Sequence, residues 1–216
     1  MVSTSQNVWP IGRTLNSIYT VVQTLKKNDF INTYLAVDGN QHNVVIKILN
    51  GSDFQDLKQN KPEASIDIER KFQELGNTLY RCQNLHIVRA LTQPFSTSDE
   101  YNQQWWCIPF IFVQGSNLKD YVQTPLSENE AIKYIKQIAR GLSEIHSQGI
   151  LHLNVNPENV IIQNNSRDAV LIGFGFINGI RIEHTLPDFK NDDAKFYPMN
   201  YSHKSKYQRL EVIFIP

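Results

Sequence analysis

Short apolar runs separated by polar turns predict β-strands in the first half of the chain. Residues 19–38 indicate two strands around a polar turn, residues 42–49 a third strand, and residues 105–113 a further one. A polar connector over residues 50–64 precedes a predicted helix, in which apolar residues recur at helical spacing: Ile68, Phe72, Leu75 and Leu79. The first half is therefore expected to be mainly strands, with one helix.

The second half opens on the helix with the clearest sequence signals. Ser127 is followed three residues later by Glu130, the pattern of a capping box, and Gly149 supplies a break at the other end. Between them, apolar residues form a stripe that we expect to be buried: Ile132, Ile135, Ile138, Leu142 and Ile145.

A polar loop separates this helix from a pair of short strands. The strands are expected at residues 160–162 and 169–172, joined by turn-forming residues. The loop before them has the sequence HLNVNPEN, and the segment after them begins GFG. This strand–loop–strand segment carries the most specific motif in the chain.

Composition narrows the class of protein. The 216 residues can bury a sizeable core, as one domain or two small lobes. Basic and acidic residues number 21 each, with no basic run, which argues against binding to nucleic acid or to an anionic membrane. Cys82 and Cys107 fit neither a metal site nor a disulfide framework. No apolar run reaches the roughly 20 residues of a spanning helix, and a cytoplasmic protein is expected.

The two polar motifs resemble those of protein kinases, in particular the bacterial eukaryotic-type Ser/Thr kinases. HLNVNPEN is similar to the catalytic loop H-R-D-x-x-x-x-N, and GFG to D-F-G. The resemblance implies an α+β fold of two lobes, an antiparallel sheet with one helix and a shortened, mainly helical lobe. It implies an extension over residues 1–17, a first lobe with its hinge over 18–113, and a truncated second lobe over 114–216.

The charged residues of the family pattern are missing from these motifs. Asn154 stands in the position of the catalytic Asp, and Gly173 in that of the Asp that would hold Mg²⁺. Asn159 matches the metal-binding Asn, but a single neutral amide is a poor site for a hard cation. Leu153 replaces the neighbouring Arg, and Asn156 a Lys. His152 and Phe174 match positions that serve packing in the family.

The first hairpin and the next strand resemble the nucleotide-binding lobe. Three glycine positions of the family's phosphate-binding loop hold Lys26, Asn28 and Ile31, and a Cβ at each restricts the backbone. The helix carries Leu75 where the family has a Glu, with Glu74 one residue away. The nucleotide pocket implied by the resemblance consists of Val45, Lys47, Ile111, Val113 and Ile161, with Phe110 as gatekeeper.

The resemblance therefore implies a catalytically inactive kinase-like module that acts in regulation or protein binding. The alternative is a divergent Ser/Thr kinase with weak ATP-dependent transfer through Lys47 and Asn159. A third hypothesis is that the chain is one piece of a longer protein, or a truncated gene product with no independent role. No cofactor is expected beyond weak, Mg²⁺-independent ATP binding.

The segment after GFG resembles an activation segment, with Tyr197-Pro198-Met199 as a weak match to A-P-E. The resemblance implies further helices that complete the second lobe, and we expect this chain to lack them. We therefore expect association, with a protein partner or with a second copy, through residues 132–145 and 212–215.

Overall fold

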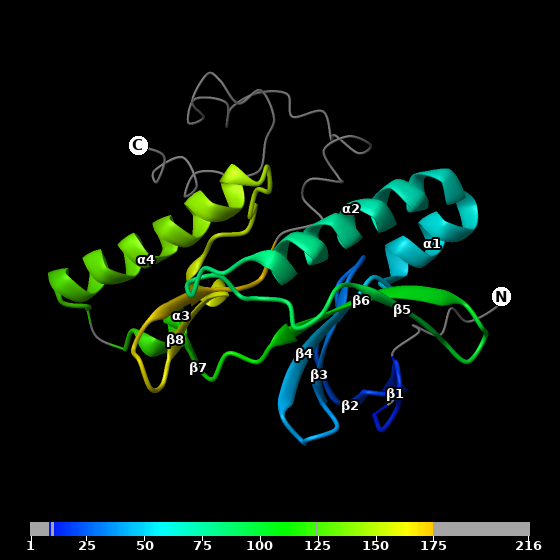
Figure 1. The fold of residues 1–216 in the computed structure, drawn as a ribbon, viewed down its shortest axis with the longest axis horizontal. Coiled ribbons are helices and arrows are strands. Elements are labelled where there is room, and N and C mark those ends of the chain that lie inside the picture. The colour runs from blue at the N-terminus through cyan, green and yellow to red at the C-terminus, as the bar shows by residue number, and fades with distance from the viewer. Residues whose placement is uncertain (1–8, 10, 124, 175–216) are drawn as a thin grey trace. The chain divides into compact units, whose positions relative to one another are not determined.

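The computed structural model describes Trp9, residues 11–123 and residues 125–174, which are the coloured part of Figure 1. The predicted activation segment beyond Gly175 and the C-terminal apolar run at 212–215 lie outside the described residues.

Two units make up the chain. The first combines residues up to 82 with residues 89–112, and the second combines residues 83–88 with the chain from 113 onward. Residues 83–88 thus group with the second unit, although they fall inside the span 18–113 that was predicted for the first lobe. The domain boundaries otherwise stay a prediction.

The first unit is built on a six-stranded sheet in the order β1-β2-β3-β4-β6-β5, in which all neighbours are antiparallel. Its strands are β1 (Thr14–Leu15), β2 (Tyr19–Lys26), β3 (Asn32–Val37), β4 (Asn43–Ile48), β5 (Phe95–Ser98) and β6 (Gln104–Ile111). The strands predicted from apolar runs are confirmed as β2, β3, β4 and β6.

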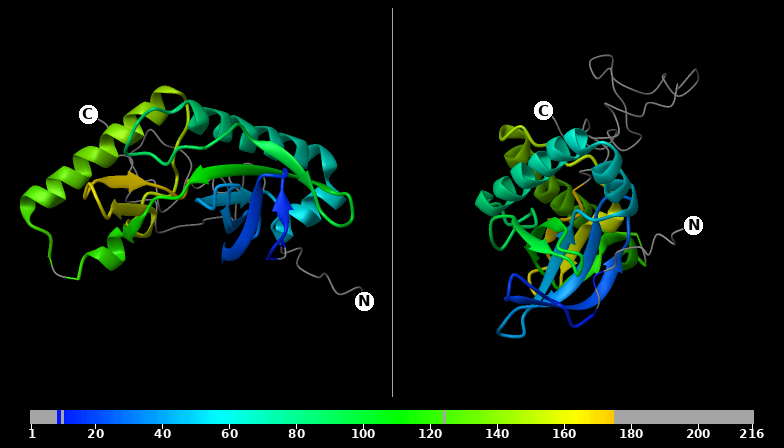
Figure 2. Two further views of the ribbon diagram at one scale, coloured as in Figure 1. Left: turned by 60° about the horizontal axis from the view of Figure 1, so that its bottom comes forward. Right: turned by 90° about the vertical axis from the view of Figure 1, so that its right-hand side faces the viewer.

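Alternation along β3 and β4 gives this sheet two different faces. One face is buried and apolar, with Tyr34, Ala36, Val44, Ile46 and Ile48. The other face carries the half-buried Val45 and Lys47, and Lys47 lies opposite Ile108 of β6. Helix α2 packs on this second face. Its Gly76 lies so close to the sheet that an added Cβ would come within 2.9 Å of the Ile108 side chain. Figure 2 shows α2 running along the sheet.

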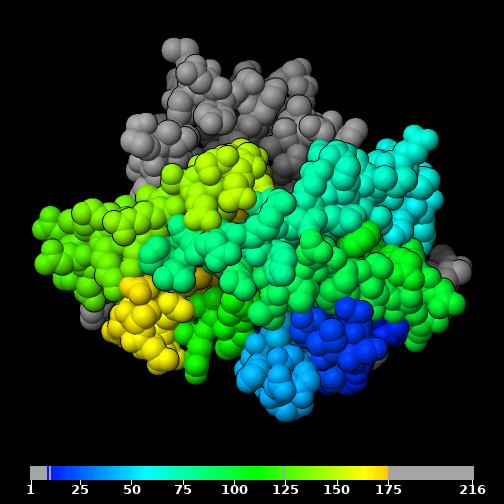
Figure 3. Space-filling model, viewed as in Figure 1, coloured from blue at the N-terminus to red at the C-terminus, as the bar shows by residue number. Residues whose placement is uncertain are grey.

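Two helices connect β4 to the rest of the unit, α1 (Ser52–Asn60) and α2 (Pro62–Arg81). They lie side by side at the surface (Figure 3). The polar connector predicted over 50–64 is therefore wrong for most of its length. The fully buried side chain in α1 is Phe54, so its sequence has no apolar stripe that would reveal a helix. In α2 the expected stripe is buried at Ile68, Phe72 and Leu79, while Leu75 is half-buried.

Trp9 is buried against the first unit. Its side chain is 3% exposed, and its backbone amide donates to the hydroxyl of Tyr34 at 3.3 Å. The guanidinium of Arg13 lies 4.2 Å from the centre of the Trp9 ring. Trp9 therefore docks the N-terminal segment onto the first unit, while Pro10 is outside the described residues.

The second unit combines a three-stranded sheet, in the order β7-β8-β9, with a long helix. Its elements are β7 (Gly115–Asn117), α3 (Leu118–Tyr121), α4 (Glu128–Ser147), the 3₁₀ turn η1 (Pro157–Asn159), β8 (Val160–Gln163) and β9 (Ala169–Leu171). The helix and the strand pair predicted for this half of the chain are confirmed.

Helix α4 begins at the predicted capping box. The Ser127 hydroxyl accepts from the amide of Glu130, and the Glu130 carboxylate accepts from the amide of Ser127. The predicted buried stripe is wrong at its start, because Ile132 is 41% and Ile135 48% exposed. Ile132 lies about 120° round the helix from the buried Ile138 at 3.6 residues per turn. The buried face consists of Tyr134, Gln137, Ile138, Gly141, Leu142 and Ile145.

A buried amide joins α4 to β9. The side chain of Gln137 accepts from the amide of Ala169 at 2.9 Å and donates to the Asp168 carboxylate at 2.6 Å. The amide of Leu171 donates to the carbonyl of His86 at 2.8 Å, so residues 83–88 add to the other side of this strand. In the part of the chain that the structure describes, no helix is long and apolar enough to cross a lipid bilayer.

Candidate functional site

Three residues singled out by the sequence come together in the second unit. Strands β8 and β9 are antiparallel neighbours, and the amide of Ile172 donates to the carbonyl of Asn159 at 2.8 Å. This pairing places Gly173 beside Asn159. The loop before η1 brings Asn154 to the same place, where its side chain contacts the carbonyl of Gly173. The positions of the catalytic Asp and of the two metal-binding residues are therefore neighbours.

Asn154 is used as a hydrogen-bond donor. Its side-chain nitrogen donates to the carbonyl of Gly173 at 3.1 Å, and that carbonyl can only accept. Its side-chain oxygen accepts from Nδ2 of Asn156 at 3.0 Å. An amide in this arrangement has no lone pair of useful basicity and no negative charge, so Asn154 cannot act as a general base near neutral pH.

Asn156 stabilises the loop from within. Its side-chain oxygen accepts from the amides of Glu158 and Asn159, at 2.9 and 3.2 Å, and so caps the turn η1. Its side-chain nitrogen donates to the backbone carbonyl and to the side-chain oxygen of Asn154. The resemblance implies only that Asn156 replaces a Lys. The signal for its capping role is the Asn directly before Pro157, a pair that commonly starts a turn.

Asn159 and Gly173 lie so close together that any side chain at position 173 would require the Asn159 side chain to move. A Cβ added at Gly173 would overlap the side-chain amide of Asn159, and Gly173 has a φ of +74°, which favours glycine. The nitrogen of Asn159 donates to the carbonyl of Asn154 at 2.9 Å. Asn159 thus occupies the space that the first atom of an aspartate at 173 would need.

No charged side chain takes part, among the described residues, in the network of Asn154, Asn156, Asn159 and Gly173. Glu158, inside the same loop, forms an exposed ion pair with Lys119 at 2.6 Å. Among the residues that the structure describes, no group of three His, Cys, Asp or Glu side chains could hold a metal ion. Hard cations such as Mg²⁺ prefer carboxylate oxygens, so this network does not fit a magnesium ion.

Two packing residues support the loop. His152 is fully buried, and its Nε2 lies 2.8 Å from the carbonyl of Ile172. Its ring lies 4.4 Å from that of Phe174, centre to centre. The histidine and the phenylalanine therefore join the loop to the segment after β9, as their matched positions imply.

In the first unit, the hairpin between β2 and β3 carries the three replaced glycine positions. Lys26 and Asn28 are exposed, whereas Ile31 is 5% exposed and belongs to the core. Glycines at these positions would leave the backbone free to adopt many conformations. Here a buried side chain holds the base of the hairpin.

Lys47 has no carboxylate partner among the described residues. Its ammonium group lies 6.0 Å from the centre of the Phe110 ring, on the half-buried face of the sheet. Burial, and then the charge of Lys26, lower the pKa of Lys47 to about 8.

In the family, a glutamate of the helix corresponding to α2 pairs with the lysine at the position of Lys47. Among the described residues of this chain, no helix carboxylate does so. Glu74 is exposed and pairs with Arg70 one turn earlier in α2, at 2.8 Å. Val45, Lys47 and Ile111 belong to the first unit, and Val113 and Ile161 to the second. The nucleotide pocket that would need all five stays a prediction.

A family model of the protein kinase domain matches residues 19–196. The chain belongs to the protein kinase family. It is 28% identical over 169 residues to serine/threonine-protein kinase D of Synechocystis, which covers 74% of this chain and 30% of that protein. It is 38% identical over 72 residues to serine/threonine-protein kinase pkn2 of Myxococcus xanthus, which covers 32% of this chain and 9% of that protein. This kinase-family chain thus spans less than a third of these relatives.

Solved structures show the same fold. The apo form of PpkA-294 superposes with a TM-score of 0.60 at 20% identity, covering 81% of this chain and 64% of that one. Rad53 in complex with AMP-PNP superposes with a TM-score of 0.58 at 20% identity, covering 76% and 40%. The predicted kinase-like α+β fold is confirmed.

Proposed function

We propose that this kinase-family domain is catalytically inactive and acts in regulation or by binding protein. The observation that carries the proposal is the neutral network around Asn154. In the described part of the site, every side-chain amide is already hydrogen-bonded within the network or to its backbone, and the position of the metal-binding Asp is a glycine packed against Asn159.

The physical reason is electrostatic. Phosphoryl transfer depends on positioning and on charges that stabilise the transferred group, supplied in kinases by the catalytic-loop Asp and by metal ions held on the D-F-G Asp and the loop Asn. Removing one preorganised stabilising group from an active site costs about 10²–10³-fold in rate. The chain has an amide and a glycine at the two acidic positions, so little rate enhancement is left.

The proposed partner is a protein, either another chain or a second copy of this one. The proposal for the nucleotide is weak ATP binding that does not depend on Mg²⁺, because Lys47 is present but no carboxylate stands at the metal position. The relatives named above are serine/threonine kinases, and the alternative function is therefore weak transfer of phosphate from ATP to Ser or Thr.

A transfer assay with γ-labelled ATP and either Mg²⁺ or Mn²⁺ tests the proposal. We expect no label on the chain or on a generic protein substrate above the level of a Lys47→Met control. Metal-dependent labelling that disappears in Lys47→Met would establish the divergent kinase instead. Labelling that survives this change would point to a contaminating kinase, which a second purification removes.

A further inference from the structure

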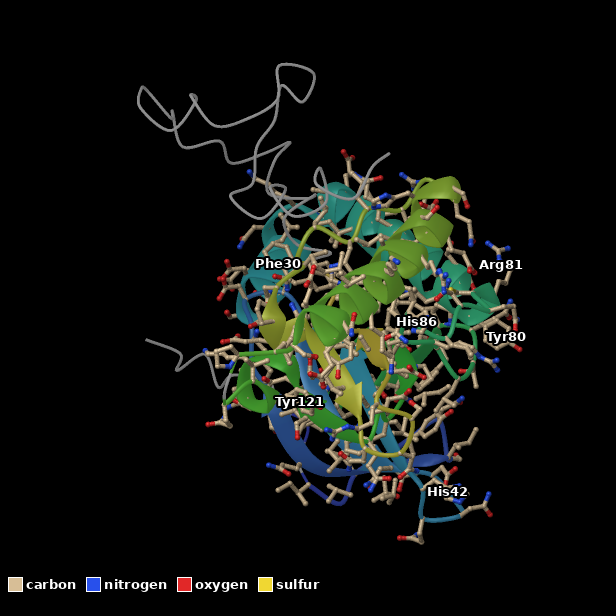
Figure 4. All side chains as sticks on the ribbon, turned by 90° about the vertical axis from the view of Figure 1, so that its left-hand side faces the viewer. Phe30, His42, Tyr80, Arg81, His86 and Tyr121 are labelled. Carbon is tan, nitrogen blue, oxygen red and sulfur yellow. The ribbon has the colours of Figure 1, made fainter. Side chains whose placement is uncertain are left out.

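The tip of the β2–β3 hairpin, residues 27–31, lies on the first turn of helix α1. The carbonyl of Asp29 accepts from the amides of Asp53 and Phe54, at 2.7 and 3.2 Å. The carbonyl of Phe30 accepts from the amide of Gly51 at 2.7 Å. Figure 4 labels Phe30 of this hairpin tip.

These bonds replace a missing helix cap. The first amides of an α-helix have no partner within the helix, and a Ser, Thr, Asp or Asn side chain at the N-cap normally supplies one. The N-cap of α1 is Gly51, which has no side chain to do so. The carbonyl of Asp29 takes this role from a different part of the chain, so the cap of α1 and the position of the hairpin tip depend on each other.

A buried pair of amides holds the base of the same contact. Nδ2 of Asn32 donates to the side-chain oxygen of Asn50 at 3.0 Å, and the two residues are 6% and 0% exposed. The side-chain oxygen of Asn32 accepts from the amide of Asn28 at 3.2 Å. The ring of Phe30 lies 6.3 Å from that of Phe54, centre to centre.

Gly51 is required by the closeness of the two segments. A Cβ added there would overlap the backbone of Asn28 and Asp29. The φ of Gly51 is −66° and its ψ is 164°, values that any residue can adopt. An alanine at 51 would therefore be acceptable to the local backbone and would act only on the contact with the hairpin.

We propose that the hairpin tip is anchored to α1 in one conformation, so that it does not adjust to a ligand. In the family pattern this hairpin is the glycine-rich loop that covers ATP phosphates. Here the carbonyls of Asp29 and Phe30 are already bound to the start of α1. The contact is therefore autoinhibitory, because the tip could close over a nucleotide only by breaking these hydrogen bonds. The inference goes beyond the proposed function, because it holds whether or not the chain transfers phosphate.

Amide hydrogen exchange of the full chain, measured by NMR, tests the anchoring. First-turn amides of an ordinary helix exchange almost freely, because their partner is water. We expect the amides of Asp53 and Phe54 to exchange at least about 100-fold more slowly than in an unstructured peptide. Added ATP should leave these rates unchanged. Free exchange of both amides, or a clear change with ATP, would overturn the proposal.

Gly51→Ala should release the tip. We expect exchange of Asp53 and Phe54 to accelerate at least about tenfold, while Ile46 and Ile48 in β4 keep their rates. Gly39→Ala is the matched control, because nothing lies within 4 Å of a Cβ at Gly39. If Gly51→Ala does not fold, Phe30→Ala serves instead, since it removes only the ring contact and should accelerate the same two amides. Unchanged rates in the folded variant would overturn the proposal.

Discussion

Lys47 is a charged side chain whose surroundings favour its neutral form. Below pH 8 it is charged in both the folded and the unfolded state, and the folded state alone bears the cost of burial. Between pH 8 and its ordinary pKa of 10.5, the unfolded state binds more protons, so stability rises with pH. The lysine therefore destabilises the folded chain at neutral pH.

We predict that Lys47→Met stabilises the fold at pH 7, since methionine keeps much of the apolar stem without the charge. One pKa unit corresponds to about 1.4 kcal/mol, which gives an expected gain of about 1–3 kcal/mol. Urea unfolding at a series of pH values measures it. The gain should shrink as the pH rises through 8 toward 10.5, and the exposed Lys27→Met should show neither effect. A destabilised Lys47→Met would mean that the ammonium group has a partner in the folded state.

Gly173 offers a second prediction about a single residue. Gly173→Ala should destabilise by about 2–3 kcal/mol, from the left-handed backbone and from the displaced hydrogen bond of Asn159. Gly149→Ala is the control for the backbone alone, because its φ is +75° and nothing lies within 4 Å of its Cβ. In urea unfolding, Gly173→Ala should cost about 1 kcal/mol more than Gly149→Ala, and Asn159→Ala should remove that excess in a double-mutant cycle. Equal costs for the two glycines would show that Asn159 does not fill the site.

Among the elements, α4 depends on its first turn. The capping box of Ser127 and Glu130 satisfies amides that have no partner inside the helix, and burial lies further along at Ile138, Leu142 and Ile145. Ser127→Ala should destabilise the second unit by about 1 kcal/mol in urea unfolding. Ser143→Ala, an exposed change inside the same helix, should cost nothing or stabilise slightly, since alanine favours helix. An equal loss for both variants would contradict the assigned cap.

For the whole molecule, the proposed lack of a magnesium site predicts that Mg²⁺ adds nothing to the thermal stability of the chain in the presence of ATP. A ligand at 100 times its Kd stabilises a fold by about 2.7 kcal/mol. We predict no Mg²⁺-dependent rise in Tm at millimolar ATP, because no carboxylate stands at the metal position near Asn159. Asn154→Asp with Gly173→Asp, if it folds, should not restore a strong response while the hairpin tip stays bound to α1. A clear Mg²⁺-dependent rise in the unchanged chain would contradict the inactive site.

The main strands and helices could be predicted because they follow from local patterns, and the kinase-like fold could be predicted from the resemblance of two short motifs to those of protein kinases. Strand alternation, the capping box of Ser127 and Glu130, and the turn between β8 and β9 depend on neighbours in sequence. The same holds for Asn154 and Gly173, which a motif locates by spacing. The stripe of α4 was predicted less well, because Ile132 and Ile135 are apolar and correctly spaced but no described segment buries them.

Only the tertiary structure decided how segments far apart in the sequence supply one another's hydrogen-bond partners. Helix α1 has a glycine at its N-cap and a single fully buried side chain, so its sequence resembles a loop. It is a helix because a carbonyl from the hairpin caps its first turn and because Phe54 is buried in the core of the first unit. Likewise, the sequence alone indicates that Asn154 and Gly173 replace two acidic residues of the family pattern, while Asn159 keeps its amide. That the three positions close into a hydrogen-bonded, neutral network depends on the pairing of β8 with β9, because hydrogen bonds between residues far apart in sequence form only when the fold brings them within about 3 Å.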